Sequence, residues 1–206
     1  MSELGRQVHW QKIYKERGEH RVSWFEEQPT ISLDLIHAVG AKSDSAIIDI
    51  GGGASRLVDA LVDRGFRDIT VLDLSESGVS IARERLGEHT AMVKWIVADV
   101  TQWRPSRQYD LWHDRATFHF LTEAADQNAY VEHLITALRP GGHAIIGTFA
   151  IDGPERCSGL PVVRYDAAAL SAALGRTFAL IETRRHEHKT PAGVIQRFQF
   201  SVFKRV

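Results

Sequence analysis

The sequence predicts an α/β protein with a single, mostly parallel β-sheet, and two observations carry this prediction. First, residues 46–50 form a mainly apolar run rich in β-branched side chains, which is typical of a strand buried on both faces of a parallel sheet. Three consecutive glycines follow, and apolar residues then recur at helical spacing over 57–62. Second, further strand-like runs alternate with helical segments along the 206 residues, as expected when helices join the strands of one sheet.

Composition and charge limit the class of protein. The chain is 44% hydrophobic and 25% charged, which is ordinary for a globular domain and argues against a disordered or membrane-embedded chain. Its formal net charge of −1 gives no support to a nucleic-acid partner. The single cysteine, Cys157, cannot form an internal disulfide, and no apolar run reaches the length of a membrane span. We therefore expect a soluble, cytoplasmic monomer or homodimer without a membrane partner.

The first 44 residues are expected to form a cap or lid segment in front of the main domain at 45–206. Apolar spacing predicts two short helices there, one near the N-terminus and one over 31–39. Trp24 and Phe25 lie between these helices, and such large aromatic side chains are costly to expose. Their predicted role is either to cover a ligand or to cap the core, and the sequence favours neither.

The glycine turn is the predicted ligand site, because α/β sheets hold nucleotide-like ligands where a strand passes through a glycine turn into a helix. Gly51, Gly52 and Gly53 would let the backbone approach a ligand that a Cβ atom would strike. A dinucleotide fingerprint requires glycine or alanine where this chain has Arg56. The carboxylate of Asp49 would repel a pyrophosphate but attract an ammonium or sulfonium group. The alternative is a tight strand–helix turn that binds nothing.

Two further acids follow strand-like runs. Asp73 lies twenty residues beyond Gly53, the spacing expected of a carboxylate that binds an adenosine ribose. A helix cap is the alternative role, but Ser75 is better placed to cap the helix that follows. Asp99 is the acid near the end of the next strand-like run, which is predicted over 93–100. Ligands of open α/β sheets bind at the carboxyl ends of the strands, so these acids are expected to face one site together with the acid beside the glycine turn.

This arrangement resembles the class I S-adenosylmethionine-dependent methyltransferases, whose first motif is (D/E)-x-G-x-G-x-G. Asp49, Gly51 and Gly53 match the motif, and Ser55 stands in the place of its last glycine. The resemblance covers roughly residues 45–149 through specific motifs and the remainder through layout. It implies S-adenosylmethionine as cofactor. It also implies a Rossmann-like, seven-stranded sheet of order 3-2-1-4-5-7-6, with the last strand antiparallel and helices on both faces.

The resemblance further implies which residues hold the cofactor, from its amino-acid end to its adenine. They are Asp49, Gly51, Gly52 and Gly53 at the amino-acid end, Asp73 and Leu74 at the ribose, Asp99 and Val100 at the adenine, and Trp24 and His113 near the transferred methyl group.

The candidate catalytic residues lie in the region 109–122. We expect the fourth strand to consist of Leu111 and Trp112 and its carboxyl end to deliver His113 and Asp114 beside the sulfonium. Either side chain could orient or deprotonate a methyl acceptor, since histidine titrates near neutral pH and carboxylates serve as bases. The alternative is that the polar side chains of this region only fix the loop by hydrogen bonds and ion pairs.

Two segments resemble the branch of this family that methylates protein lysines. One is Asp114-Arg115-Ala116-Thr117, which follows that branch's pattern of an acid, a basic residue, a small residue and threonine. The other is the N-terminal pattern W-x-x-x-Y followed by W-F-x-E. The resemblance implies a protein lysine as one possible acceptor, with a small molecule equally compatible.

The C-terminal part of the chain completes the predicted sheet. The long loop 150–161 leaves a strand's carboxyl end and is assigned to the substrate mouth, with Cys157 as a spectator thiol. The last two strand-like runs are expected to pair antiparallel. His186 and His188 would face the same way on one strand, but a third ligand at metal-binding spacing is missing.

The predicted function is transfer of a methyl group from S-adenosylmethionine to a nitrogen, oxygen or sulfur atom of a small-molecule or protein acceptor. Because a sulfonium is already an activated donor, holding the acceptor in line with the methyl group supplies much of the rate. Two less favoured alternatives are an NAD-dependent oxidoreductase and a module that binds the cofactor without turnover.

Overall fold

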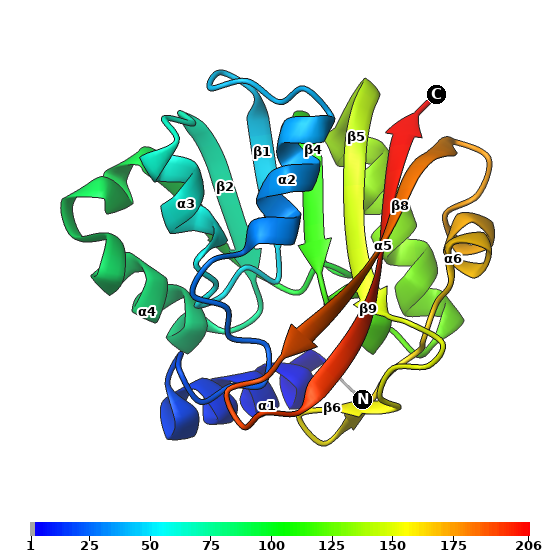
Figure 1. Ribbon diagram of the computed structural model, residues 1–206. Helices are drawn as coiled ribbons and strands as arrows, with labels where there is room; N and C mark the ends of the chain where they lie inside the picture. The colour runs from blue at the N-terminus through cyan, green and yellow to red at the C-terminus, as the bar shows by residue number, and fades with distance from the viewer. Residues whose placement is uncertain (1–2) are drawn as a thin grey trace.

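The structure is a computed structural model that describes residues 3–206, with the backbone alone for Glu3 (Figure 1). Its helices are α1 (Glu3–Arg17), α2 (Thr30–Ala38), α3 (Leu57–Asp63), α4 (Glu76–Leu86), α5 (Ala124–Ala137) and α6 (Ala167–Leu174), with 3-10 turns at Gly87–Met92 and Phe118–Phe120. Its strands are β1 (Ala46–Ile50), β2 (Asp68–Asp73), β3 (Val93–Val97), β4 (Tyr109–Arg115), β5 (Leu138–Phe149), β6 (Arg156–Cys157), β7 (Leu160–Pro161), β8 (Phe178–Lys189) and β9 (Ile195–Arg205).

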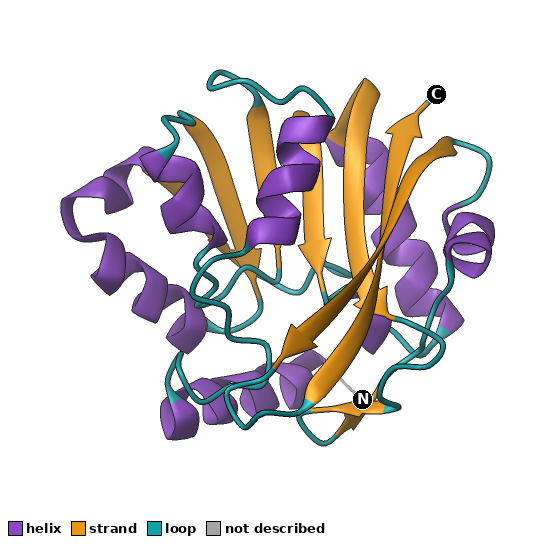
Figure 2. Ribbon diagram, in the orientation of Figure 1, coloured by secondary structure: helices purple, strands orange, loops and turns teal. Residues whose placement is uncertain are grey.

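Seven strands form one sheet in the order β3-β2-β1-β4-β5-β9-β8, which confirms the predicted order (Figure 2). The strands predicted as sixth and seventh are numbered β8 and β9 here. A short hairpin, β6–β7, comes before them in the sequence and forms a separate two-stranded sheet. Strands β1 to β5 pair in parallel, whereas β9 pairs antiparallel with both β5 and β8. The loop 150–161 thus contains a small hairpin.

Helices cover both faces of the sheet, as predicted, and each face has its own hydrophobic core (Figure 2). Ile47 of β1 packs in the cluster that takes residues from α2, α3 and α4, whereas its neighbour Ile48 packs in the cluster with α5 and α6. Successive side chains of a strand point to opposite faces, so the uninterrupted apolar run of β1 is buried on both.

The fourth strand is longer than the sequence predicts. β4 continues past Trp112 to Arg115, because it pairs with β1 as far as Asp114 and with β5 as far as Arg115. His113 lies opposite Asp49 in this register. The expectation that His113 and Asp114 follow the strand's carboxyl end is therefore wrong, since both lie within the sheet. The third strand, by contrast, ends at Val97, so Asp99 lies in the loop beyond it.

The N-terminal helix lies across the carboxyl ends of the parallel strands (Figure 1). The guanidinium of Arg6 pairs with Asp99, in the loop after β3, at 2.7 Å. Farther along α1, the side-chain oxygen of Gln11 accepts a hydrogen bond from the backbone N–H of Ser77 at 2.9 Å. These contacts dock α1 on the sheet edge where α/β proteins bind their ligands. Within the described residues, no helix combines the length and the apolar character of a membrane span.

Candidate active site

A cavity lies at the carboxyl-end edge of the sheet, between α1 and the loops that leave the strands. Residues far apart in the sequence line it together: Arg6, Trp10, Tyr14, Trp24, Gly51, Leu72, Asp73, Leu74, Ala98, Asp99, Val100, Arg115, Ala116, Thr117, Phe120, Leu121, Phe149, Cys157, Gln196 and Phe198.

The cavity brings together only part of the predicted cofactor site. Of the predicted residues, those that line it are Trp24, Gly51, Asp73, Leu74, Asp99 and Val100. Those that do not are Asp49, Gly52, Gly53, His113 and Asp114. The first group comes from the N-terminal segment, the glycine turn, the end of β2 and the loops after β2 and β3. The second group lies in β1, in the glycine turn and in β4.

Asp73 ends β2 and is nearly buried. Its Oδ1 accepts a hydrogen bond from the backbone N–H of Ser75 at 2.7 Å, and Ser75 in turn caps α4, as predicted, by accepting from Gly78. Burial raises the pKa of Asp73 to about 7, assisted by the negative charge of Asp49 and opposed by backbone donors from Ser75 and Gly53. The ionised form of this buried carboxylate would be stabilised by any ligand that brings hydroxyl donors or positive charge.

Asp99 is also nearly buried and is held by two groups of donors. One oxygen accepts from the backbone N–H of Thr101 at 2.8 Å and from its hydroxyl at 2.7 Å. The other accepts from the guanidinium of Arg6, with Nη2 at 2.7 Å and Nε at 3.1 Å. Arg6 also pairs with Asp126 at 2.8 Å, so α1 is tied to the adenine end of the predicted site.

The three glycines are required by neighbouring side chains of the protein itself, in addition to any ligand. A Cβ atom on Gly51 would lie 1.9 Å from Oγ1 of Thr117, and one on Gly53 would lie 2.5 Å from Oη of Tyr14. A Cβ atom on Gly52 would lie 2.6 Å from a carboxylate oxygen of Asp49. The sequence argument attributed the glycines to ligand approach alone, and the structure adds a packing reason.

His113 bridges β1 and α2 beneath the glycine turn. Its Nδ1 lies 2.7 Å from Oδ1 of Asp49, and its Nε2 lies 2.9 Å from Oγ of Ser32. Both ring nitrogens are therefore occupied within the protein, and the imidazole is 2% exposed. This arrangement fixes the carboxylate of Asp49 and leaves His113 without access to an acceptor in the cavity.

Asp114 holds the loop that follows β4. Its two oxygens accept from the backbone N–H groups of Thr117 at 2.7 Å and Phe118 at 3.0 Å, and from the hydroxyl of Tyr130 at 2.6 Å. The Tyr130 hydroxyl also accepts from the indole N–H of Trp112 at 2.8 Å. Asp114 is fully buried, and this burial raises its pKa to about 6. These contacts agree with the alternative prediction for this region, in which polar side chains fix the loop by hydrogen bonds.

Aromatic side chains form much of the remaining lining. The rings of Trp10 and Trp24 meet edge to face at 5.6 Å, and Trp10 meets Phe120 in the same way at 5.0 Å. Sequence reasoning noted Trp10 and Tyr14 only as a pattern and did not place them at the site. It missed Arg6 and Phe198 altogether, because their place depends on how α1 and β9 fold back onto the sheet edge.

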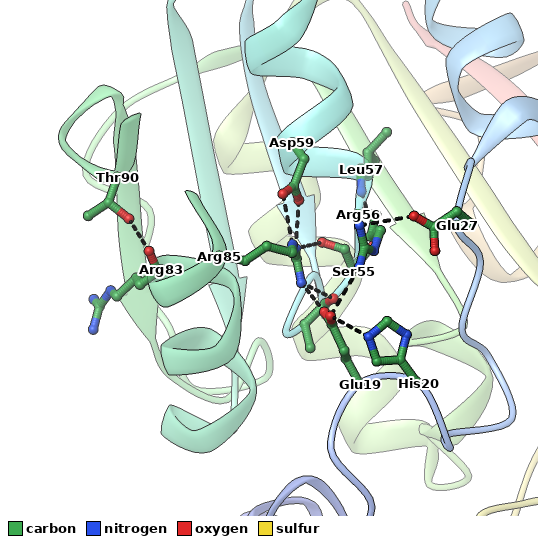
Figure 3. A network of polar contacts seen from close by, with 11 residues as sticks. Glu19, His20, Glu27, Ser55, Arg56, Leu57, Asp59, Arg83, Arg85 and Thr90 are labelled. Carbon is green, nitrogen blue, oxygen red and sulfur yellow. Dashed lines mark hydrogen bonds and ion pairs between the residues drawn. The ribbon is translucent and has the colours of Figure 1, made fainter. Parts of the chain in front are cut away.

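Arg85 on α4 supports the glycine turn from outside the cavity (Figure 3). Its guanidinium donates to the backbone carbonyl oxygens of Ala54 at 3.1 Å and Ser55 at 2.9 Å. It also pairs with Asp59 at 2.6 Å and with Glu19 of the segment between α1 and α2. Sequence reasoning missed this residue, which ties the turn to both α4 and the N-terminal segment.

Arg56, the residue that breaks the dinucleotide pattern, points away from the turn toward the N-terminal segment (Figure 3). It pairs with Glu19 and with Glu27, each at 3.1 Å. The large side chain is thus used to anchor the segment that joins α1 to α2.

The remaining candidates do not form a reactive centre. His186 and His188 share one face of β8, as expected, and approach Glu26 at 3.5 Å and 3.1 Å. Among the described residues, no group of three potential metal ligands comes together. Cys157 lines the cavity, and its burial raises the pKa of the thiol to about 11, which keeps it protonated.

Comparison with known proteins agrees with this geometry. Residues 47–142, slightly less than half of the chain, match the family model described as "Methyltransferase domain". The chain is 28% identical over 151 residues to the eEF1A lysine and N-terminal methyltransferase homolog of Drosophila melanogaster, covering 69% of this chain and 22% of that protein. It is 32% identical over 111 residues to malonyl-[acyl-carrier protein] O-methyltransferase 1 of Ilyobacter polytropus, covering 53% and 40%. The chain therefore spans less than half the length of these relatives.

A solved structure shows the same fold. The N-methyltransferase NodS of Bradyrhizobium japonicum, in complex with S-adenosyl-L-homocysteine, superposes with a TM-score of 0.74 at 18% identity, covering 96% of this chain and 98% of that one. These findings agree with the predicted class: the chain has the Rossmann-like fold of this methyltransferase, and its sequence is similar to a methyltransferase domain and to proteins named methyltransferases.

Proposed function

We propose that this chain transfers a methyl group from S-adenosylmethionine to an acceptor held in the cavity under α1. The observation that carries the proposal is that Asp73 and Asp99, from the ends of neighbouring strands, line one cavity together with Gly51 of the glycine turn. Carboxylates at these places suit an adenosine, and the same edge of the sheet is the ligand site of open α/β folds.

The residues present fit the cofactor. Asp73 would accept from the ribose hydroxyls with Leu74 beside it, and Asp99 with Val100 would meet the adenine. The turn of Gly51 would receive the amino-acid end, and Asp49, held by its bond to His113, would attract its positive charge from behind the turn. The raised pKa of Asp73 supports this role, because its backbone donors do not fully offset the cost of burying the charge, and ribose hydroxyls would add further donors to the ionised form.

S-adenosylmethionine, when bound, supplies a methyl group on a positively charged sulfur. The protein's own contribution is then mainly to position the acceptor and to exclude water. Trp10 and Trp24, which line the cavity, would keep water from the reacting atoms. No base from β4 is proposed, because His113 and Asp114 do not line the cavity and are occupied by hydrogen bonds within the protein.

The N-terminal residues 1–44 are proposed to act as a lid over the main domain at 45–206. Of this segment, α1 contributes Arg6, Trp10 and Tyr14 to the lining, and the stretch before α2 contributes Trp24. Because Arg6 is paired with Asp99 and Tyr14 packs at Gly53, entry of a cofactor requires α1 to move outward and then to close again.

A protein lysine is the second candidate acceptor. The likeness to the Drosophila lysine and N-terminal methyltransferase homolog over 69% of this chain favours it. The likeness to malonyl-[acyl-carrier protein] O-methyltransferase 1 favours a carrier-bound acceptor instead.

Thermal unfolding with added ligands tests the proposed cofactor. A ligand that binds only the native state raises the melting temperature by mass action. We expect S-adenosylhomocysteine to raise the melting temperature of the chain and NAD, at the same concentration, to leave it unchanged. Stabilisation by NAD without stabilisation by S-adenosylhomocysteine would favour the oxidoreductase alternative.

A further inference from the structure

The cavity has a second side, built from strands on the other side of β1. Asp73 ends β2 and Asp99 lies in the loop after β3, whereas Arg115, Phe149 and Phe198 come from β4, β5 and β9. The sheet order β3-β2-β1-β4-β5-β9 therefore separates the two groups. If the cofactor lies over the first group, as proposed above, the second group is left for the acceptor.

Arg115 supplies a buried positive charge to this second side. Its side chain is 10% exposed, and its guanidinium carbon lies 5.4 Å from the centre of the Phe198 ring. Nη1 donates to the backbone carbonyl oxygen of Trp24 at 2.9 Å. Burial lowers the pKa of Arg115, which reflects the cost of keeping this cation away from water.

The charge of Arg115 is only partly compensated by the protein. Its Nη2 forms an ion pair with Glu26 at 2.9 Å in a geometry that makes no hydrogen bond, and its buried Nε has no hydrogen-bond acceptor. Glu26 does not line the cavity, and it is shared with His186 and His188. A buried donor without a partner is unfavourable, and more so when it is charged, so an acceptor group from a ligand would be favoured here.

Gln196 adds a second unsatisfied polar group to the same side. It lies on β9, lines the cavity and is 7% exposed, and its side-chain oxygen has no hydrogen-bond partner. The surrounding surface is aromatic, with Trp24 and Phe198 among the lining residues. A buried cation, one amide and several rings match a flat ligand with one anionic group and one polar edge.

We propose that the methyl acceptor is a small aromatic carboxylate, with its carboxylate bound by Arg115 and its polar edge by Gln196. This inference rests on the proposed methyltransferase function and names the substrate class of that site. The planar guanidinium presents parallel donors that suit a carboxylate.

Binding of matched acid and amide probes tests this inference. We would titrate the chain saturated with S-adenosylhomocysteine with benzoate against benzamide, and with indole-3-carboxylate against indole-3-carboxamide, by calorimetry. Each acid is expected to bind about tenfold or more tightly than its own amide, the difference that a charge-assisted hydrogen bond supplies. In Arg115→Gln the preference for the acid should disappear, and in Arg115→Lys, which keeps the charge, it should remain in part.

Arg185→Gln is the matched control, because Arg185 is half exposed on β8 and pairs with Asp152 outside the cavity. It should leave the acid preference unchanged. The inference is overturned if the amides bind as tightly as the acids, if no probe binds, or if Arg115→Gln keeps the preference. If Arg115→Gln does not fold, the comparison of acid and amide affinities on the wild-type chain still tests the inference. Failure of S-adenosylhomocysteine itself to bind would contradict the proposed function instead.

Discussion

At the scale of single residues, Asp114 accepts hydrogen bonds from Thr117, Phe118 and Tyr130. In Asp114→Asn, an amide NH2 group replaces one of the two acceptor oxygens and faces a hydrogen-bond donor that has lost its acceptor. We expect the free energy of unfolding to fall by about 2 kcal/mol, the cost of a buried donor left without its partner. Urea denaturation measures this loss, and Glu123→Gln, at an exposed position beside the same loop, should change it by less than about 0.5 kcal/mol.

The same variant separates a positioning role from a catalytic one. If Asp114 acted only as a base, Asp114→Asn would lower methyl transfer without lowering stability. Unchanged urea denaturation of the variant would therefore contradict the role that the hydrogen bonds indicate.

His113 shows what the sequence can and cannot predict about a residue. Its type and its place near the sheet edge suggested a base, and nothing in the sequence indicated that Asp49 and Ser32 would occupy its two nitrogens. Ser32 lies far from His113 along the chain and belongs to the helical segment before the sheet. Such a partner becomes visible only when α2 packs on the sheet.

At the scale of elements, the turn after β1 depends on support from α4. Arg85 holds the carbonyl oxygens of Ala54 and Ser55 and pairs with Asp59 and Glu19. Arg85→Met removes these donors and the cation that pairs with Asp59, whereas Glu19 keeps its ion pair with Arg56. We expect the free energy of unfolding to fall by about 2–3 kcal/mol, as for a broken and largely buried ion pair. We also expect affinity for S-adenosylhomocysteine to fall, because the turn is no longer held.

Arg83→Met provides the comparison on the same helix. Arg83 is about one third exposed and pairs with Glu76 at 3.1 Å. Because exposed ion pairs contribute little, this variant should retain both stability and affinity. Equal effects of the two substitutions, in chemical denaturation and in calorimetry with S-adenosylhomocysteine, would show that the turn does not depend on Arg85.

The length of β4 marks the limit of element prediction. The apolar residues Leu111 and Trp112 identified the strand, but its end is set by pairing with β1 and β5. The polar residues 113–115 extend it because both neighbours are present to pair with them. The strand–glycine–helix unit at β1, in contrast, was predictable because its signals are local.

At the scale of the whole molecule, the sheet order and the antiparallel last strand agree with the resemblance drawn from the glycine turn and the strand-end acids. The side of the cavity proposed for adenosine was predictable from local signals, since Asp73 ends β2 and Asp99 lies just beyond the end of β3. The side proposed for the acceptor was not predictable, because Arg115 and Gln196 line one cavity only when β9 returns to pair with β5.

Asp73 and its neighbours are proposed to hold the adenosine of S-adenosylmethionine. Burial raises the pKa of the Asp73 carboxyl group to about 7, and ribose hydroxyls would donate hydrogen bonds to its ionised form. Below pH 7 the chain must release a proton to bind, so affinity should fall toward lower pH by up to about tenfold per pH unit. Asp73→Asn should bind weakly and without this pH dependence. Asp68→Asn, at the other end of β2, should bind as the wild type does.

The most direct measurement is calorimetric titration of the chain with S-adenosylhomocysteine on both sides of pH 7. We expect one binding event per chain, tighter at the higher pH, and largely lost in Asp73→Asn but not in Asp68→Asn. No heat of association at either pH, or an Asp73→Asn variant that binds as tightly as the wild type, would contradict the account.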